Sequence, residues 1–259
     1  MNWKAACSSF LKKHAPRTLM ALDIARHNRH FEPEYWLLPR LCQRNASSVD
    51  VGGNTGHYAY YLSRLTQQVH VFEPNPICLA QLRRVQRRNM IFHEVALSDH
   101  AGTALMRFDP HNTGVGTIEA RNRLDNNPGI RNIVEREVKI ARLDDFNLRD
   151  IAFIKIDVEG HEPAVLRGAA GLIEMQKPVL LIEIERRHNR TAFEEVEDLL
   201  NGFGYSVLRL SAGSLVPVSR QEIDQVQTLP VTPAYVNNFI FVPRERSALL
   251  DRLMRSAGR

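Results

Sequence analysis

Three ionisable side chains alternate in the segment IKIDVEGHE, and their types suit proton transfer. Asp157, Glu159 and His161 follow the apolar run IAFIKI, which has the composition of a buried strand. Ligands collect at the carboxyl ends of the strands in an open parallel sheet. A carboxylate or an imidazole at that edge can act as general base for an acceptor that must lose a proton. These three residues are therefore the candidate catalytic groups.

A structural interpretation of this region stays open beside the catalytic one. Asp157 can bind a cofactor or the backbone, Glu159 can cap the following helix, and His161 can be a solvated residue of its first turn. Glu183 and Glu185 lie at the end of the next expected strand, in the segment LLIEIERRH. One of them can contact the acceptor, or both can be charges exposed to water at the strand end. Neighbouring carboxylates can gather a divalent cation. No ligand set is identifiable beyond Asp157, so no metal is predicted.

A glycine-rich turn upstream is suited to hold a cofactor. The segment VDVGGNTGHY places Asp50 at the end of a strand and Gly52, Gly53 and Gly56 in the turn that enters a helix. Glycine lets the backbone approach a ligand closely, and the first turn of the helix offers N–H groups to a carboxylate. The G-x-G-x-x-G pattern of nicotinamide cofactors would need glycine at position 51, where this chain has valine. A dehydrogenase is therefore disfavoured.

The next expected strand adds an acid at the spacing of a ribose ligand. VHVFEP ends in Glu73, twenty-three residues after Asp50, where a carboxylate can accept hydrogen bonds from both ribose hydroxyls. Asn75 follows in the turn, as either a helix cap or a ligand contact. The loop and the acid together predict a cofactor that contains adenosine.

Short β-branched runs alternate with amphipathic stretches from Ser47 onward, which indicates parallel strands joined by helical crossovers. We expect an α/β fold with a mostly parallel twisted sheet, helices on both faces and a terminal antiparallel strand. A hairpin is expected around TALMRFDP. The expected strands are SSVDVG, VHVFEP, IFHEVALS, EREVKI, IAFIKIDV, PVLLIEI, GYSVLRL and NNFIFVP, and the expected helices cover 58–65, 76–88, a stretch from about 163, and 192–200.

The chain divides into one main domain, 46–243, with an extension at each end. Residues 1–45 are expected to be a helical extension, and 244–259 a docked C-terminal helix. The stretch 111–132 is polar and rich in glycine and asparagine, which predicts a mobile acceptor lid, with an ordinary exposed loop as the alternative. The extension carries apolar residues that suit one helical face: Tyr35, Trp36, Leu37, Leu38 and Leu41.

Composition sets broad limits on the class of protein. The 259 residues are 44% hydrophobic, which suits one compact domain, and the three cysteines have neither disulfide nor zinc-ligand spacing. Neither a signal peptide nor an apolar run of about 18 residues is present, so we expect a cytoplasmic protein without a membrane span. The net charge of +5 is a weak bias toward anionic ligands, because acidic residues are interspersed throughout.

Five motifs in one order carry a family resemblance. With the glycine loop, VFEPNP, VALSDHAG, ARLDDF and IKIDVEGHEPAVLRGA, the chain resembles the FkbM-like family of S-adenosylmethionine-dependent O-methyltransferases over about residues 46–187. The resemblance implies a class I methyltransferase fold, which is Rossmann-like. It also implies S-adenosyl-L-methionine as cofactor and methylation of a hydroxyl on a sugar, glycolipid or secondary metabolite.

The family pattern assigns roles to individual residues of this chain. Gly53 stands where the family commonly has alanine, a change between small residues that should not impair binding. The residues implied to frame the active site are Asp157, Glu159, Gly160 and Glu162. The candidate cofactor-binding residues are Asp50, Gly52, Gly53, Asn54, Gly56, Glu73, Asn75, Ala96 and Asp157.

Two other functions remain alternatives to a small-molecule or glycan acceptor. An RNA methyltransferase is suggested by the basic balance and by Arg83, Arg84, Arg87 and Arg88 on one expected helix. That helix should pack outside the sheet, away from the cofactor edge, so a solvated basic face is favoured. A noncatalytic cofactor-binding scaffold is disfavoured by the acids and glycines present at both edges of the site. The oligomeric state stays open.

Overall fold

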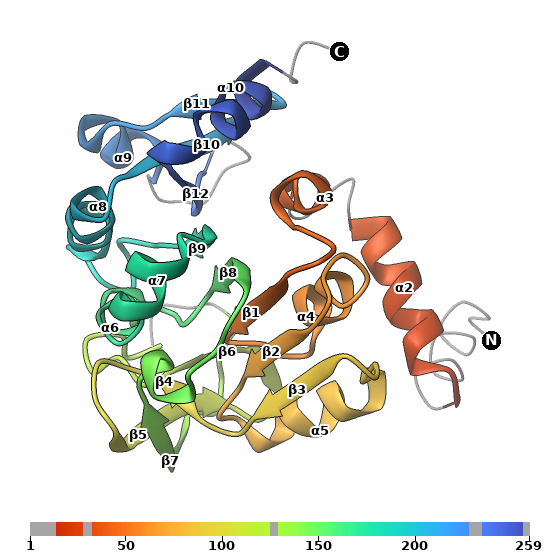
Figure 1. Cartoon of the computed structure of the whole chain (residues 1–259). Helices are drawn as coiled ribbons and strands as arrows, with labels where there is room; N and C mark the ends of the chain where they lie inside the picture. The colour runs from red at the N-terminus through yellow and green to blue at the C-terminus, as the bar shows by residue number, and fades with distance from the viewer. Residues whose placement is uncertain (1–13, 28–32, 125–128, 228–234, 256–259) are drawn as a thin grey trace.

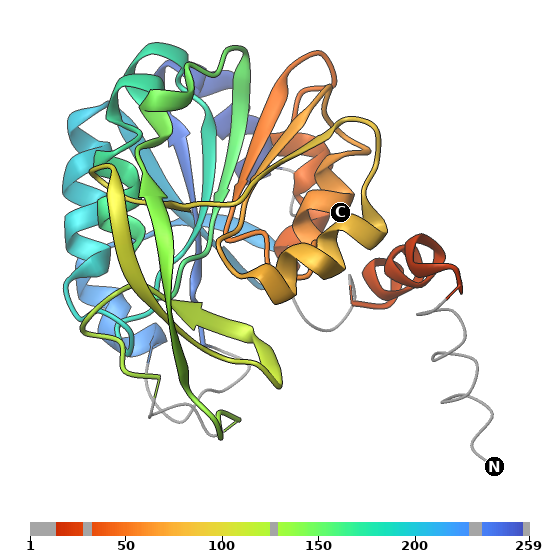
Figure 2. The same ribbon diagram turned by 90° about the horizontal axis from the view of Figure 1, so that it is seen from below.

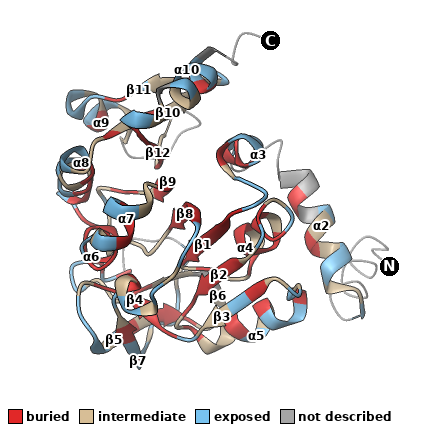
Figure 3. Ribbon diagram, viewed as in Figure 1, coloured by how far each residue is buried: buried red, intermediate tan, exposed pale blue. Residues whose placement is uncertain are grey.

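The computed structural model describes residues 14–27, 33–124, 129–227 and 235–255. Two sheets and their helices make an α/β fold, with an eight-stranded sheet at the centre (Figure 1). The central strands are buried along their whole length, and the exposed residues lie on the surrounding helices, on loops and on the smaller sheet (Figure 3). Within the described ranges, no helix combines the length and the apolarity that crossing a membrane requires.

The main sheet reverses its strand order at β1. Parallel strands extend from β1 to β2 and β3 on one side and to β8 and β9 on the other, and β12, β10 and β11 continue antiparallel beyond β9. A reversal of this kind opens a ligand crevice at the carboxyl edge of the sheet. The strands are β1 (Ser47–Val51), β2 (Val69–Phe72), β3 (Met90–His93), β8 (Ile151–Ile156), β9 (Val179–Glu183), β10 (Tyr205–Ser211), β11 (Ser214–Pro217) and β12 (Asn238–Pro243).

Two apolar cores lie on the two faces of this sheet. One core joins α6 (Glu162–Arg167), α7 (Ala170–Gln176), α8 (Ala192–Gly202) and α9 (Arg220–Val226) to one face. The other core joins the opposite face to α2 (Pro16–His27), α3 (Leu38–Leu41), α4 (His57–Leu62), α5 (Pro76–Val85) and α10 (Ser247–Arg255). Alternate side chains of each strand enter opposite cores, because strand side chains point to the two faces in turn. The expected layering and the terminal antiparallel strands are confirmed.

A second sheet of four strands departs from the expected plan. Its order is β4 (Ala96–Leu97), β7 (Val134–Ala141), β5 (Gly102–Asp109), β6 (Asn112–Thr117), and it has a small core of its own. Figure 2 shows these strands, coloured yellow to green, standing apart from the main sheet. The expected single strand IFHEVALS is divided between the two sheets, because β3 pairs with β2 and β4 pairs with β7. TALMRFDP forms β5, which pairs with β6 and β7.

The described part of the N-terminal extension, residues 14–27 and 33–45, is largely helical, but its apolar residues do not form one continuous face. The 3-10 helix η1 (Pro33–Trp36) is followed by the short α3, which has a proline in its first turn. The break turns Trp36 outward, where it is 60% exposed, although its four apolar partners in the expected face are buried. The prediction of one apolar face was therefore wrong at Trp36.

Candidate functional site

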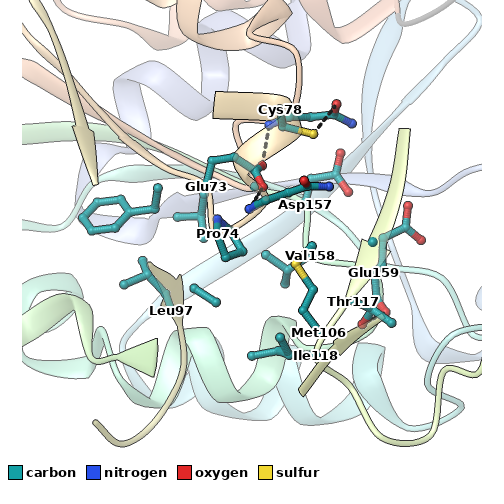
Figure 4. A pocket seen from close by; sticks show the side chains of 17 residues that line it. Glu73, Pro74, Cys78, Leu97, Met106, Thr117, Ile118, Asp157, Val158 and Glu159 are labelled. Atoms are coloured by element: carbon teal, nitrogen blue, oxygen red, sulfur yellow. Dashed lines mark hydrogen bonds between the residues drawn. The ribbon is translucent and has the colours of Figure 1, made fainter. Parts of the chain in front are cut away.

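Two adjoining cavities lie at the carboxyl edge of the sheet, where the strand order reverses. They share Gly52, Asn54 and Asp157. The first cavity lies between the ends of β1 and β2 and the second sheet, and the second lies between β1, β8, α4 and the N-terminal extension. Figure 4 shows side chains from these separate elements around the first cavity, among them Glu73, Met106 and Glu159.

The glycine loop brings β1 and β8 together at the shared wall. A Cβ atom on Gly52, whose φ is +80°, would lie 1.9 Å from the backbone oxygen of Asp157, so only glycine fits there. A Cβ atom on Gly53 would lie 2.3 Å from a methyl carbon of Val71. The valine therefore accounts for glycine in place of the alanine that the family commonly has.

Glu73 ties the glycine loop to the turn after β2. Its two carboxylate oxygens accept hydrogen bonds from the backbone N–H groups of Asn54 and Asn75, each at 2.7 Å. Burial raises the pKa of Glu73 to about 7 against the lowering effect of these two bonds. The Asn75 side chain caps α5 by accepting the N–H of Ile77 at 3.0 Å, and the residue also lines the first cavity. Asn75 is therefore both the cap of α5 and a residue of the cavity wall.

The opposite wall of the first cavity is apolar and comes largely from the second sheet. Ala96, one of the candidate cofactor residues, lies there as expected. Leu97, Met106 and Ile118 complete the wall, and the sequence analysis missed them. No sequence motif marks these three residues. They reach the cavity only because the second sheet packs against the carboxyl edge of the main sheet.

The second cavity has a charged floor. Asp50 is 1% exposed, and its Oδ2 atom has no hydrogen-bond partner among the described residues. Burial raises the pKa of Asp50 to about 7, and the positive charge of Lys155 opposes this shift. Lys155, also 1% exposed, lies beside Asp50 on β8, because the two residues are register partners. The sequence analysis missed this lysine. The one sign of it was a single charged residue inside the apolar run IAFIKI.

Glu159 lines the first cavity beside Asp157 and is held in a strained turn. Its φ is +56°, and its backbone oxygen accepts hydrogen bonds from Thr117 Oγ1 at 3.0 Å and Asn122 Nδ2 at 2.8 Å. Burial, together with the charges of Asp157 and Glu185, raises the pKa of Glu159 well above its ordinary value. A raised pKa brings a carboxylate closer to the range that suits a general base.

The stretch expected to be a lid contributes directly to this turn. Thr117 ends β6 and Asn122 follows it, so the stretch 111–132 begins with a strand and then binds the Glu159 turn. Asp109 closes the base of the stretch by accepting the backbone N–H groups of His111 and Arg131. Residues 125–128 lie outside the described residues.

His161 lies apart from both cavities. Its Nε2 atom is 2.9 Å from Ser98 Oγ, its Nδ1 atom is 3.3 Å from Glu119 Oε2, and it is not among the residues that line either cavity. Burial lowers its pKa. Glu162 and Gly160 form the turn beside it, where Glu162 accepts the Gly160 N–H at 2.9 Å. The structure therefore brings Asp157 and Glu159 together and leaves His161 outside.

The two acids that follow β9 are engaged within the protein. Glu183 accepts a hydrogen bond from Asn237 Nδ2 at 2.7 Å, and burial raises its pKa well above its ordinary value. Glu185 is 3% exposed and accepts the Tyr235 hydroxyl at 2.9 Å. Burial would raise the pKa of Glu185, but its ion pair with Arg187 outweighs burial, so the pKa is lowered. Neither acid lines the two cavities.

Metal ligands and basic residues do not gather at this site. Among the described residues, no group of three or more His, Cys, Asp or Glu side chains is arranged to hold a metal ion. Arg87 and Arg88 lie just before β3 begins, which is the opposite edge of the sheet, and Arg83 pairs with Glu94. The helix α5 ends at Val85, so the expectation that Arg87 and Arg88 belong to it was wrong, and neither residue lines the two cavities.

The chain is similar to known methyltransferases in sequence and in fold. The model of the methyltransferase FkbM domain matches residues 50–207. The chain is 27% identical over 180 residues to methyltransferase 1 of Beauveria bassiana, covering 61% of this chain and 72% of that protein. It is 28% identical over 197 residues to methyltransferase sdnD of Sordaria araneosa, covering 64% and 75%. The crystal structure of the methyltransferase FkbM from Methylobacillus flagellatus aligns with a TM-score of 0.51 at 17% identity, covering 88% of this chain and 55% of that one.

The main sheet and its helices have the Rossmann-like fold of class I methyltransferases. Because the domain match spans more than half of the chain, this protein belongs to the FkbM methyltransferase family. S-adenosylmethionine is accordingly its cofactor.

Proposed function

We propose that this protein transfers the methyl group of S-adenosylmethionine to a hydroxyl oxygen of a sugar, glycolipid or secondary-metabolite acceptor. The observation that carries the proposal is the position of Glu159, a largely buried carboxylate with a raised pKa that lines the first cavity close to Asp157, a residue of the wall shared by the two cavities. A hydroxyl must lose its proton when it is methylated, and a carboxylate at this point can take that proton.

The residues of the two cavities fit the two halves of the cofactor. The first cavity combines an acid, Glu73, with an apolar wall that includes Leu97 and Met106, which suits a ribose and an adenine. The second cavity offers Asp50, whose buried Oδ2 atom has no partner among the described side chains and backbone groups. A buried acceptor without a partner is costly, and an ammonium group would satisfy it. We therefore assign the adenosine to the first cavity and the methionyl part to the second.

The bound cofactor supplies an electrophilic methyl group on a positively charged sulfur. The residues of this chain would position the acceptor oxygen and remove its proton. In-line displacement depends strongly on the placement of the reacting atoms, so a rigid Glu159 turn, held by Thr117 and Asn122, is an advantage. In this assignment Asp157 accepts a hydrogen bond from the acceptor or the cofactor at the shared wall, and Glu159 receives the hydroxyl proton.

An RNA acceptor is less well supported, because Arg87 and Arg88 lie at the opposite edge of the sheet. Phosphate contacts need basic side chains on the face that receives the nucleic acid. A noncatalytic scaffold is disfavoured by Glu159 itself, since a strained and buried carboxylate is costly to maintain without a function.

Labelled S-adenosylmethionine tests the proposal when it is combined with a panel of sugars, glycolipids, hydroxylated secondary metabolites and RNA. We expect label to enter a hydroxyl-bearing small molecule or glycolipid as an ether, with an equal amount of S-adenosylhomocysteine formed. Transfer to RNA alone, or binding of the cofactor without transfer to any acceptor, would contradict the proposal.

A further inference from the structure

Lys155 is a buried lysine inside the central strand β8. It is 1% exposed, and the residues before and after it in the strand, Ile154 and Ile156, have buried apolar side chains. A lysine is seldom buried unless other groups compensate its charge. Lys155 also lines the second cavity together with Asp50 and Asp157. Lys155 therefore lies at the floor of the second cavity, which it lines together with Asp50 of β1 and Asp157, the residue that follows β8.

Three elements hold the lysine ammonium group in place. Its Nζ atom donates a hydrogen bond to Asn238 Oδ1 on β12 at 3.1 Å and lies 3.8 Å from Glu183 Oε2 on β9. It also lies 5.1 Å from the ring centroid of Tyr58 on α4, within the range of a cation–π contact. The positive charge is thus fixed under the cavity instead of moving freely at its mouth.

The charges of the second cavity match those of an amino-acid group. Lys155 is the one lysine or arginine among the described residues that line it, and Asp50 and Asp157 are the acids. An ammonium group is favoured beside Asp50, where the Oδ2 atom has no described partner. A carboxylate is repelled by both acids and attracted by the lysine, because opposite charges interact strongly in a buried site.

We propose that Lys155 binds the carboxylate of the methionyl part of S-adenosylmethionine and so selects ligands that carry an amino-acid group. This inference rests on the proposed placement of the methionyl part in the second cavity. A purely structural role for Lys155, in which it neutralises the neighbouring acids, is the alternative. That role would affect the binding of every ligand, whereas recognition affects only ligands that have a carboxylate.

Two thioethers separate these roles in a binding experiment. S-adenosylhomocysteine has the amino-acid group, and 5′-methylthioadenosine keeps the adenosine and the sulfur but lacks that group. We expect Lys155→Met to weaken S-adenosylhomocysteine binding by about 10- to 100-fold, as for loss of a hydrogen bond between charged groups. Binding of 5′-methylthioadenosine should change by less than about twofold, within the scatter of independent sites. Titration calorimetry measures both affinities.

Lys139→Met is the matched control, because Lys139 is an exposed lysine of β7 outside both cavities. It should leave both affinities unchanged. If Lys155→Met does not fold, Lys155→Gln keeps an amide donor for Asn238 and should give the same selective loss. Unchanged S-adenosylhomocysteine affinity, or an equal loss for both thioethers, would overturn the inference.

The wild-type protein provides a further test without any substitution. It should bind S-adenosylmethionine more tightly than the decarboxylated form, and equal affinities would also overturn the inference. If wild-type protein binds neither thioether, the proposed placement of the cofactor fails instead, so the two failures are distinguishable.

Discussion

The Oε2 atom of Glu159 lies 3.1 Å from Nδ1 of His188, and both side chains are largely buried. The two residues come from the loops that follow β8 and β9, which are parallel neighbours. Burial raises the pKa of Glu159 and lowers that of His188 to about 4. The imidazole is therefore neutral at neutral pH, and it lies beside the carboxylate as a polar neighbour without the geometry of a hydrogen bond, because Glu159 Oε2 has no hydrogen-bond partner among the described residues.

The pH dependence of catalysis should change when this contact is removed. His188→Leu replaces the polar ring beside the Glu159 carboxylate by an apolar side chain, so the charged form of Glu159 becomes costlier to bury and its pKa should rise further. The acid limb of kcat/KM should move to higher pH by about one unit, equivalent to about 1.4 kcal/mol. A pH–rate profile measures this shift. His161→Leu is the matched control, since His161 lies outside both cavities, and identical profiles for wild type and His188→Leu would contradict the role of His188.

Substitution of Glu73 should weaken cofactor binding. Glu73→Ala removes the proposed acceptor of the ribose hydroxyls, and the affinity for S-adenosylmethionine should fall by about 1.5–3 kcal/mol. The variant should also melt at a lower temperature, because the backbone N–H groups of Asn54 and Asn75 lose their acceptor. Glu73→Gln keeps one acceptor oxygen and should lose less of both. Calorimetry that finds unchanged affinity in folded Glu73→Ala protein would refute the assignment.

The contribution of Asp50 and Glu73 to stability without cofactor should fall as pH rises from about 4 to about 7. Asp50 and Glu73 have pKa values raised by burial to about 7, so in this window the folded protein keeps protons that the unfolded chain has already released. Unfolding then releases protons from these two groups, and their contribution to stability decreases with increasing pH. Thermal melts across this window measure the slope. Asp50→Asn, which cannot ionise, should lose the negative contribution of Asp50 to the slope and melt higher than wild type above pH 7; a slope equal to that of wild type would show that Asp50 does not titrate in this range.

The stretch 111–132 should respond to substrate. Its backbone beyond β6 is held mainly by side-chain contacts to the Glu159 turn and by Asp109 at its base. The described residues between Thr117 and β7 form neither strand nor helix, so local opening should be easy. Amides after Thr117 should therefore exchange faster than those of β1 and β8 and slow down when cofactor and acceptor bind. Hydrogen exchange measures this difference. Protection equal to the central strands in the free protein would contradict a lid.

Much of the main sheet was predictable, because its strands and helices carry local patterns. The buried runs around Val49 and Ile154 alternate with amphipathic helices, and the expected parallel sheet with antiparallel strands at its end is confirmed. The second sheet was not predictable from such patterns. The short β4 owes its place to pairing with β7, more than thirty residues further along the chain, and no local signal reports such a partner.

The candidate site was predictable where a motif places a residue at a strand end. Asp50, Glu73, Asp157 and Glu159 all line the cavities as expected, and their proposed roles remain predictions. Lys155 looked like one charge in a strand, and its burial depends on partners from other strands. His188 reaches Glu159 through the pairing of β8 with β9, which a linear motif cannot express. The alternation that put His161 beside Asp157 assumed an extended chain, whereas Glu159 and Gly160 turn with positive φ and direct His161 away.

The single-turnover rate of methyl transfer by Glu159→Gln tests the central claim most directly. Glutamine keeps the size and most of the hydrogen-bonding capacity of the side chain but cannot take a proton as a carboxylate does. We predict that the rate falls by about 10²–10⁴-fold, while cofactor affinity and melting temperature stay near wild type. The parallel variant His161→Gln should keep the wild-type rate. A Glu159→Gln protein that transfers the methyl group at the wild-type rate would contradict the account.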